Sequence, residues 1–450
     1  MKLLNKVLIF LKNNFRYILV FLLAIAIYEF FGFGMNYGDP ISNYGFSYAI
    51  ANGQVPYLEF NTVSTPLFAF YASIGLRFWN NYLMFLIEQA ILVTITFYFL
   101  YKLYDKKSYL VLAILIGLNF YGILATYNFM CFSMLVIILY LEEKHSDKDY
   151  LIGFFIGLAI LSKHTVGCFF IIPTLIKYFS NWRKILKRAL GCLVPCSLFL
   201  IYLLVKGAMG AFIDLCFLGL FDFSSSNNNY FNNIFFLCCL FLILAIYLIY
   251  KNWQDIKNYY LILTFFFCIP IFDLAHFVFF CASVMMMMLP YLRWKNKYNI
   301  VTFLLISFLS LISSLMVILD LDIIFSSKFE HFEYTLLTKK IYKNNLKVNE
   351  FLDSYSGAIV LSYYTMQYDI IKNNKLDYYD VLMNGNFGYD GINKMIKRLS
   401  LEDSNIFIVS MSDYNDDYSY SQFSKDIVDY VILNGKLIES KYGYNVYYIE

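Results

Sequence analysis

Long apolar segments alternate with short polar connections from Tyr17 to Leu319. Each apolar segment has about twenty residues, the length that a helix needs to cross the hydrocarbon of a bilayer. Runs this continuous predict helices, because a helix satisfies its backbone hydrogen bonds within the segment. We predict about eleven membrane spans on this length rule. Their centres lie near Leu22, Leu92, Ile114, Leu135, Gly157, Ile172, Leu198, Leu242, Phe265, Met286 and Ser310.

Basic residues fall in every second connection between these spans. They precede the first span and follow the second, fourth, sixth, eighth and tenth spans, as Lys6, Lys106, Lys144, Arg183, Lys257 and Lys295 illustrate. The positive-inside rule places these connections in the cytoplasm. The N-terminus is then cytoplasmic, and the other connections, together with everything after Leu319, are expected outside.

The pattern changes near Asp320, where hydropathy falls and strand and helix periodicities alternate. We predict a membrane domain over residues 1–319 and a soluble extracytoplasmic α/β domain over residues 320–450. The expected helices of the second domain are Phe332–Tyr355, Gly391–Leu399 and Phe423–Leu433. The expected strands are Ala358–Tyr363, Tyr379–Met383 and Ile406–Ser410, followed by a hairpin of Lys436–Ser440 and Asn445–Ile449.

Composition agrees with this fold class, a polytopic α-helical membrane protein with a C-terminal extracytoplasmic α/β domain. The 450 residues are 60% hydrophobic and 15% charged, whereas soluble domains are nearer about 25% charged. The formal net charge of +3 is too small to indicate a nucleic-acid partner. Membrane lipids are the expected surroundings of the chain.

The first outer loop, residues 34–80, contains the most informative stretch, Gly38–Pro66. It carries two carboxylates, Asp39 and Glu59, and three prolines. A connection that only returned the chain to the bilayer would need a few residues. We interpret this longer, polar and aromatic loop as part of a reaction site at the outer membrane surface.

Other polar residues are expected at the outer ends of spans. They are Tyr127 and Asn128, Lys163 and His164, and Asp273 and His276. Ionisable groups at membrane depth are costly and indicate functional sites by default. Each alone could equally be an interfacial residue hydrated by lipid headgroups. Their shared side favours one site, because random placement would scatter them over both sides.

This set of residues suits glycosyl transfer from a lipid phosphate. A positioned carboxylate can take the proton of an acceptor hydroxyl as it attacks the anomeric carbon. The leaving phosphate needs positive charge and hydrogen-bond donors, which Lys163, His164 and His276 would supply. Asp273 and His276 are three residues apart and share a face of a helical turn, so Asp273 could orient His276.

The order of the first span, Asp39, Gly53-x-x-Pro56-Tyr57, Pro66 and a second span resembles the GT-C superfamily of membrane glycosyltransferases. That superfamily includes the dolichyl-phosphate-mannose protein mannosyltransferases, the bacterial aminoarabinose transferases and the Rgt-type transferases. The motifs cover about the first hundred residues, and the architecture extends to Leu319. The resemblance implies a polyprenyl-phosphate sugar as donor and hexosyl or pentosyl transfer to a glycan, lipid or protein acceptor outside the cell membrane. It assigns the presumed base to Asp39 and matches Lys163 to a basic residue at a comparable outer span end.

The sequence departs from the superfamily at the acidic pair. Many relatives carry two adjacent acids, whereas here Pro40 follows Asp39 and the second acid is Glu59. Metal use therefore stays open, with Mg²⁺ or Mn²⁺ held by Asp39, Glu59 and His276 as the alternative. We predict Asp39 and Glu59 as catalytic residues. The predicted substrate-binding residues are Tyr57, Tyr127, Asn128, Lys163, His164, Asp273 and His276.

Functions from other classes fit parts of the pattern. A polysaccharide polymerase would also act outside on polyprenyl-linked sugars. A flippase for lipid-linked oligosaccharides predicts charges at mid-depth and no large outer domain, which this sequence does not favour. A non-catalytic envelope protein is the remaining alternative.

Overall fold

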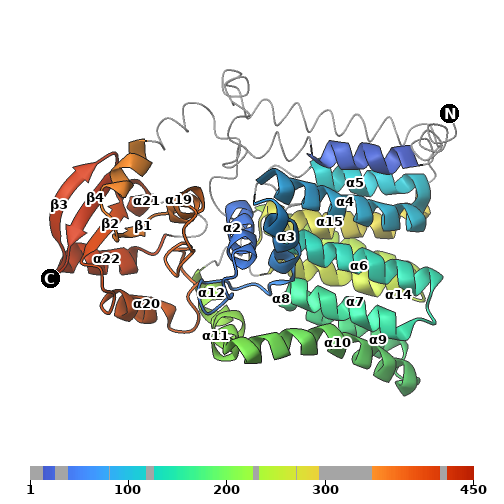
Figure 1. Cartoon of the computed structure of the whole chain (residues 1–450). Coiled ribbons are helices and arrows are strands. Elements are labelled where there is room, and N and C mark those ends of the chain that lie inside the picture. The colour runs from blue at the N-terminus through green and yellow to red at the C-terminus, as the bar shows by residue number, and fades with distance from the viewer. Residues whose placement is uncertain are drawn as a thin grey trace.

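The computed structural model describes residues 14–25, 39–80, 82–117, 126–226, 233–269, 271–292, 347–415 and 423–450. The predicted span centred on Ser310 and most of the predicted helix Phe332–Tyr355 lie outside these residues. Residues 347–353, at the end of that predicted helix, are helical. The N-terminal part of the chain forms a helical bundle, and the C-terminal part forms a separate sheet with helices beside it (Figure 1).

The helices of the bundle follow the apolar segments of the sequence. After residues 14–25 they are α2 (Asp39–Ala51), α3 (Leu67–Phe78), α4 (Tyr82–Tyr104), α5 (Ser108–Gly117), α6 (Tyr127–Lys144), α7 (Asp149–Ser162), α8 (His164–Gly167), α9 (Ile172–Lys177), α10 (Trp182–Lys206), α11 (Met209–Ile213), α12 (Leu220–Ser226), α13 (Asn233–Lys251), α14 (Ile256–Ile262) and α15 (Leu274–Met288).

Five helical stretches in the described ranges are long and apolar enough to cross a membrane. They are Met84–Leu115, Trp182–Lys206, Met209–Ser226, Asn233–Lys251 and Leu274–Tyr291. Shorter apolar helices, among them Asp149–Ser162 and His164–Lys177, occupy two further predicted spans. The bundle is therefore that of a membrane protein.

One segment differs from the prediction. The predicted spans centred on Leu198 and Leu242 leave residues 209–226, with the polar positions Asp214 and Asp222, in an expected outer connection. They form α11, a π-helix at Asp214–Leu218 and α12. Contacts with the C-terminal part of the chain supply partners for these polar positions. The Lys394 ammonium lies 2.8 Å from Asp214 Oδ2, for example.

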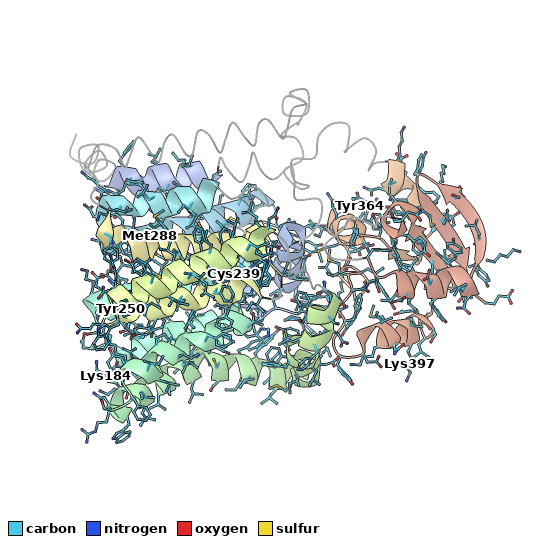
Figure 2. All side chains as sticks on the ribbon, turned by 180° about the vertical axis from the view of Figure 1, so that it is seen from behind. Lys184, Cys239, Tyr250, Met288, Tyr364 and Lys397 are labelled. Atoms are coloured by element: carbon cyan, nitrogen blue, oxygen red, sulfur yellow. The ribbon has the colours of Figure 1, made fainter. Side chains whose placement is uncertain are left out.

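The predicted cytoplasmic connections gather at one end of the bundle. Lys107 Nζ donates to the Leu289 carbonyl over 2.7 Å, and Lys184 Nζ donates to the Ser146 carbonyl over 3.1 Å. Lys184 and Tyr250 lie at the end of the bundle away from Tyr364 and Lys397 of the C-terminal part (Figure 2). Connections that are far apart in sequence, and that the basic residues predict on one side of the membrane, thus lie at one end of the bundle.

A buried ion cluster joins three helices near this end. Arg188 of α10 is 2% exposed, and its guanidinium pairs with Glu142 of α6 and, over 3.0 Å, with Asp149 Oδ1 of α7. Gly153 lets α7 approach α10 closely, since a Cβ there would lie 1.9 Å from the Arg188 carbonyl oxygen. A buried guanidinium is tolerated only when it is paired in this way, so the cluster fixes how the helices meet.

The C-terminal unit, defined here as residues 347–415 and 423–450, contains a four-stranded sheet. Its strand order is β1-β2-β4-β3, with β1 parallel to β2 and the other pairs antiparallel. The strands are β1 (Ile359–Leu361), β2 (Ile406–Ser410), β3 (Lys436–Lys441) and β4 (Tyr444–Tyr448), and the helices are α19 (Thr365–Lys372), α20 (Gly391–Leu399), α21 (Met411–Tyr414) and α22 (Lys425–Asn434).

Alternating side chains along β2 enter two different cores. Phe407 and Val409 pack with Met395 and Val428 from α20 and α22. Ile408 instead packs with apolar residues of the opposite face, including Phe351. The period of two in the sequence reflects this two-sided burial.

The predicted elements at Gly391–Leu399 and Ile406–Ser410 are present with those bounds, and the closing hairpin is confirmed. The predicted strand Tyr379–Met383 is wrong. That segment forms turns, apart from an isolated bridge between Met383 and Phe423. Its polar neighbours explain the difference, because the Asp377 carboxylate accepts from the Tyr379 N–H at 2.6 Å, as a turn requires. Helix α19 was not predicted.

A buried carboxyl group lies in this turn-rich segment. Asp380 is 5% exposed, and its Oδ2 accepts from the Asp377 N–H over 2.5 Å. Burial raises the pKa of Asp380 well above its usual range, and the Asp377 and Asp369 carboxylates raise it further. In the unfolded chain the pKa of an aspartate carboxyl is about 4. Its stabilising contribution is therefore complete below about pH 4 and is lost as the pH rises towards the folded-state pKa.

We expect Asp380→Asn to stabilise the protein more at high pH than at low pH. The amide keeps an oxygen for the Asp377 N–H and cannot ionise. The melting temperature of the variant, measured in detergent relative to wild type, should rise by about 2 °C or more between about pH 5 and pH 8. The exposed Asp403→Asn is the matched control and should show no such trend. A pH-independent difference for Asp380→Asn would contradict the assignment.

Candidate functional site

The part of the predicted outer loop that lies between α2 and α3, residues 52–66, has an unusual backbone conformation. It is called the outer loop below. Gly53 has φ +88°, which glycine adopts readily, but Tyr57 has φ +70° and is a bulky residue. Tyr57 is fully buried, its ring lies 5.2 Å from that of Phe212, and its hydroxyl donates to the Ser64 carbonyl over 2.9 Å. These contacts hold the loop in shape. Tyr57, predicted as a substrate-binding residue, thus packs inside the loop.

A small cavity lies between this loop, α2 and the start of α6. Its polar lining comes from Asn43, Thr62, Ser64, Thr65 and Tyr127. Asp39 is the first residue of α2 and stands four residues before Asn43, so the two positions share a face of the helix. The side chain of Asp39 is outside the described part of the structure. The backbone nevertheless places this position one turn from the cavity lining.

Lys163 lies beside the same cavity. Helix α7 ends at Ser162, Lys163 is extended with φ −150° and ψ 98°, and α8 begins at His164. The Lys163 ammonium donates to Asn128 Oδ1 over 2.7 Å. It also lies 5.5 Å from the ring centroid of Tyr127 and 5.3 Å from that of Phe267. Three predicted site residues, Tyr127, Asn128 and Lys163, are thus together, and Tyr127 also lines the cavity.

His164 points away from this group. The break at Lys163 sends the neighbouring side chain to another side, where the His164 ring lies 5.4 Å from that of Phe217. His164 is 7% exposed and packs against the π-helix Asp214–Leu218. Lys163 and His164 are adjacent in sequence, but their side chains therefore do not form one binding group.

Asp273 and His276 contact each other at the start of α15. Asp273 Oδ1 accepts from the His276 backbone N–H over 2.8 Å and lies 2.7 Å from His276 Nδ1. Partial burial raises the pKa of Asp273, but His276 and the Lys163 ammonium outweigh it and hold that pKa below its usual value. The effect of Lys163 on Asp273 relates this pair electrostatically to the cation beside the cavity.

The Glu59 carboxylate has a hydrogen-bond partner in the loop and a cation near it. Its Oε2 accepts from the Val55 N–H over 2.6 Å, and its Oε1 lies 3.9 Å from Lys375 Nζ. No cluster of three or more His, Cys, Asp or Glu side chains suited to a metal ion occurs among the described residues. Glu59 and His276 each have another partner, and the third residue of the Mg²⁺ or Mn²⁺ alternative, Asp39, has its side chain outside the described part of the structure. That alternative stays a prediction.

Sequence reasoning missed several polar residues near the outer loop. Glu88 of α4 is 6% exposed, and its Oε1 accepts from the Gly75 N–H over 2.8 Å, which ties α4 to α3. A carboxylate and an amide, Glu88 and Gln89, inside an apolar segment were the available signal. Gln54 and Asn61 gave no signal, because their partners lie in the C-terminal unit.

Comparison with known proteins identifies a solved structure of the same fold. The crystal structure of ArnT from Cupriavidus metallidurans bound to undecaprenyl phosphate matches with a TM-score of 0.56 and 12% sequence identity, covering 96% of this chain and 98% of that chain. Comparison with protein-family models and with curated protein sequences gives no match. The match shows a shared fold with that structure, and this fold agrees with the one that the resemblance in the sequence implies.

Proposed function

We propose that this protein is a glycosyltransferase that moves a sugar from a polyprenyl-phosphate donor to a cell-envelope acceptor on the outer side of the cell membrane. The observation that carries the proposal is the position of Lys163. Lys163 is 9% exposed, and its ammonium lies 5.5 Å from the ring centroid of Tyr127, which lines the polar cavity. A cation held at membrane depth suits an anionic headgroup. The shared fold with ArnT, which was crystallised bound to undecaprenyl phosphate, supports a lipid of this class.

Lys163 would bind the phosphate of the donor. Asn128 and the rings of Tyr127 and Phe267 orient the ammonium, so little side-chain freedom would be lost on binding. As the bond between the anomeric carbon and the phosphate oxygen breaks, negative charge grows on the phosphate. A preorganised cation stabilises that charge without having to reorganise during the step. His276, oriented by Asp273, would add a hydrogen-bond donor.

Asp39 would act as the general base. The acceptor hydroxyl loses its proton to the carboxylate while its oxygen attacks the anomeric carbon, and polyprenyl phosphate leaves. The position of Asp39 at the first turn of α2, on the face of Asn43, supports this role. Glu59, bound to the Val55 N–H, would act on the loop conformation and not on the substrate.

The proposal requires that the C-terminal unit and the outer loop lie outside and that the N-terminus is cytoplasmic. It also divides the chain into a membrane domain over residues 1–319 and an extracytoplasmic domain over residues 320–450. We expect cysteines introduced at Ser224 and Ser412 to react with a membrane-impermeant thiol reagent in intact cells, in a background without exposed thiols. A cysteine at Asn181 should react only after permeabilisation. Labelling at position 181 in intact cells would contradict the orientation.

Product analysis tests the proposal against the polymerase alternative. Purified protein is incubated with polyprenyl-phosphate sugars that carry a labelled sugar, together with cell-envelope fractions. Transfer of label to a lipid, glycan or protein with one sugar per acceptor is the expected result. A ladder of growing products would support a polymerase, and the absence of any transfer with every donor would contradict the proposal.

A further inference from the structure

The outer loop is bound to the C-terminal unit through the side chain of Gln54. Gln54 is 4% exposed and lies between Gly53, with φ +88°, and the strained Tyr57. Its Nε2 donates to the Leu376 carbonyl over 2.7 Å, and its Oε1 accepts from the Leu376 N–H over 2.9 Å. Both ends of one carboxamide are thus paired with the same backbone residue, as a neighbouring strand would pair.

Further hydrogen bonds run between the same two segments. Asn61 Nδ2 donates to the Tyr378 carbonyl over 2.9 Å. The Tyr378 hydroxyl lies 2.9 Å from the Tyr57 carbonyl oxygen and 2.7 Å from the Leu58 carbonyl oxygen. The Arg398 guanidinium lies 3.6 Å from the centre of the Tyr378 ring. Residues 376–378 therefore act as a template for the loop.

The loop needs such a template because its conformation is costly. A bulky residue in the left-handed region is strained and persists only where its surroundings determine it. The same loop carries Thr62, Ser64 and Thr65 to the cavity wall. Thr65 Oγ1 also donates to the Ile160 carbonyl over 3.1 Å, three residues before Lys163. A shift of the loop would therefore move the cavity wall, while the Lys163 ammonium keeps its own hydrogen bond to Asn128.

We propose that Gln54 is a positioning residue for the transfer reaction, through which Leu376 of the C-terminal unit holds the outer loop in its active conformation. This inference rests on the proposed function. Gln54 touches no reacting group. It acts by placing the loop that lines the cavity beside Lys163 and α2. The C-terminal unit is then a part of the active enzyme, required for turnover as well as for stability.

Two substitutions test this role by turnover. Gln54→Ala removes both hydrogen bonds, and kcat per folded protein should fall by roughly tenfold to a hundredfold, the scale of a misplaced site. The KM for the donor should change by less than about threefold, because Lys163 is untouched. A role in stability alone would lower the melting temperature and leave kcat below that temperature unchanged.

Gln54→Glu adds a pH-dependent readout. Its carboxylate keeps an acceptor for the Leu376 N–H but faces the Leu376 carbonyl with a second oxygen. Protonation restores the donor, so the ratio of variant to wild-type kcat should rise towards one as the pH falls from about 8 to about 5. Other titratable groups near the loop, Tyr48, Glu59, Lys375 and Asp377, are the same in both proteins and cancel in the ratio. Gln254→Glu, at an exposed site between α13 and α14, is the matched control and should give a flat ratio.

Hydrogen exchange separates failure of this inference from failure of the proposed function. Amides of residues 52–66 should exchange faster in Gln54→Ala than in wild type, and in Gln54→Glu faster at about pH 8 but not at about pH 5. If wild type shows no transfer, the proposed function fails. In that case, unchanged exchange of residues 52–66 in Gln54→Ala would also overturn the idea that residues 376–378 hold the loop. If wild type is active, wild-type kcat in Gln54→Ala, or a flat ratio for Gln54→Glu, overturns the positioning role.

Discussion

Asp39→Asn is expected to lower turnover by about a hundredfold or more, the scale of losing a general base. The substitution keeps the size of the side chain and its place at the first turn of α2. It removes only the capacity to accept a proton from the acceptor hydroxyl. Turnover is measured as sugar transferred per folded protein, with insertion and melting temperature compared with wild type.

Two further acidic residues provide controls for Asp39→Asn. Glu59→Gln should cost less, because Glu59 holds the Val55 N–H and the amide keeps an acceptor for it. Asp105→Asn should have no effect, since Asp105 is exposed in the connection after α4 and asparagine tolerates its positive φ of 48°. Full activity of Asp39→Asn would show that the base is another group.

Lys163→Ala should weaken donor binding by about tenfold to a hundredfold, the range expected for a charge-assisted hydrogen bond to phosphate. Lys163→Arg should also bind poorly, because the site around Asn128, Tyr127 and Phe267 holds a compact ammonium and not a planar fork. His164→Ala should have a smaller effect, since its ring faces Phe217. Binding is measured as the donor dissociation constant of each purified variant.

The alternative for Lys163 is a side chain that only extends to the headgroups. Such a lysine tolerates arginine. Lys206, exposed at the end of α10, is a matched example, and Lys206→Ala should leave donor affinity unchanged. Unchanged affinity in both Lys163→Ala and Lys163→Arg would exclude the phosphate role.

Local patterns predicted much of the fold. Helix α20 and strand β2 have the predicted bounds because their periodicities are set by residues close in sequence. The break at Lys163 coincides with a polar pair, Lys163 and His164, that is followed by Gly167 in an apolar run. The strand predicted at Tyr379–Met383 failed because the Asp377 and Asp380 carboxylates accept backbone hydrogen bonds and form turns that apolar alternation does not reveal.

Part of the arrangement of the candidate site residues was predicted from the sequence. Asn128, Tyr127 and Lys163 were identified as polar residues on one side, and they meet in the fold. The diverging direction of His164 could not be predicted, because it depends on a single extended residue between two helices. The pairing of Gln54 with Leu376 spans 322 positions, and periodicity in one sequence carries no information on such a contact.

The central claim is that the protein cleaves the bond between sugar and lipid phosphate. The most direct measurement is the release of polyprenyl phosphate from a panel of polyprenyl-phosphate sugars, labelled in the lipid, by purified wild type and Asp39→Asn in the presence of envelope acceptors. We predict that wild type releases polyprenyl phosphate from at least one donor. We predict that the rate of release by Asp39→Asn is lower by about a hundredfold or more. Absence of release by wild type with every donor, or equal release by both proteins, would contradict the account.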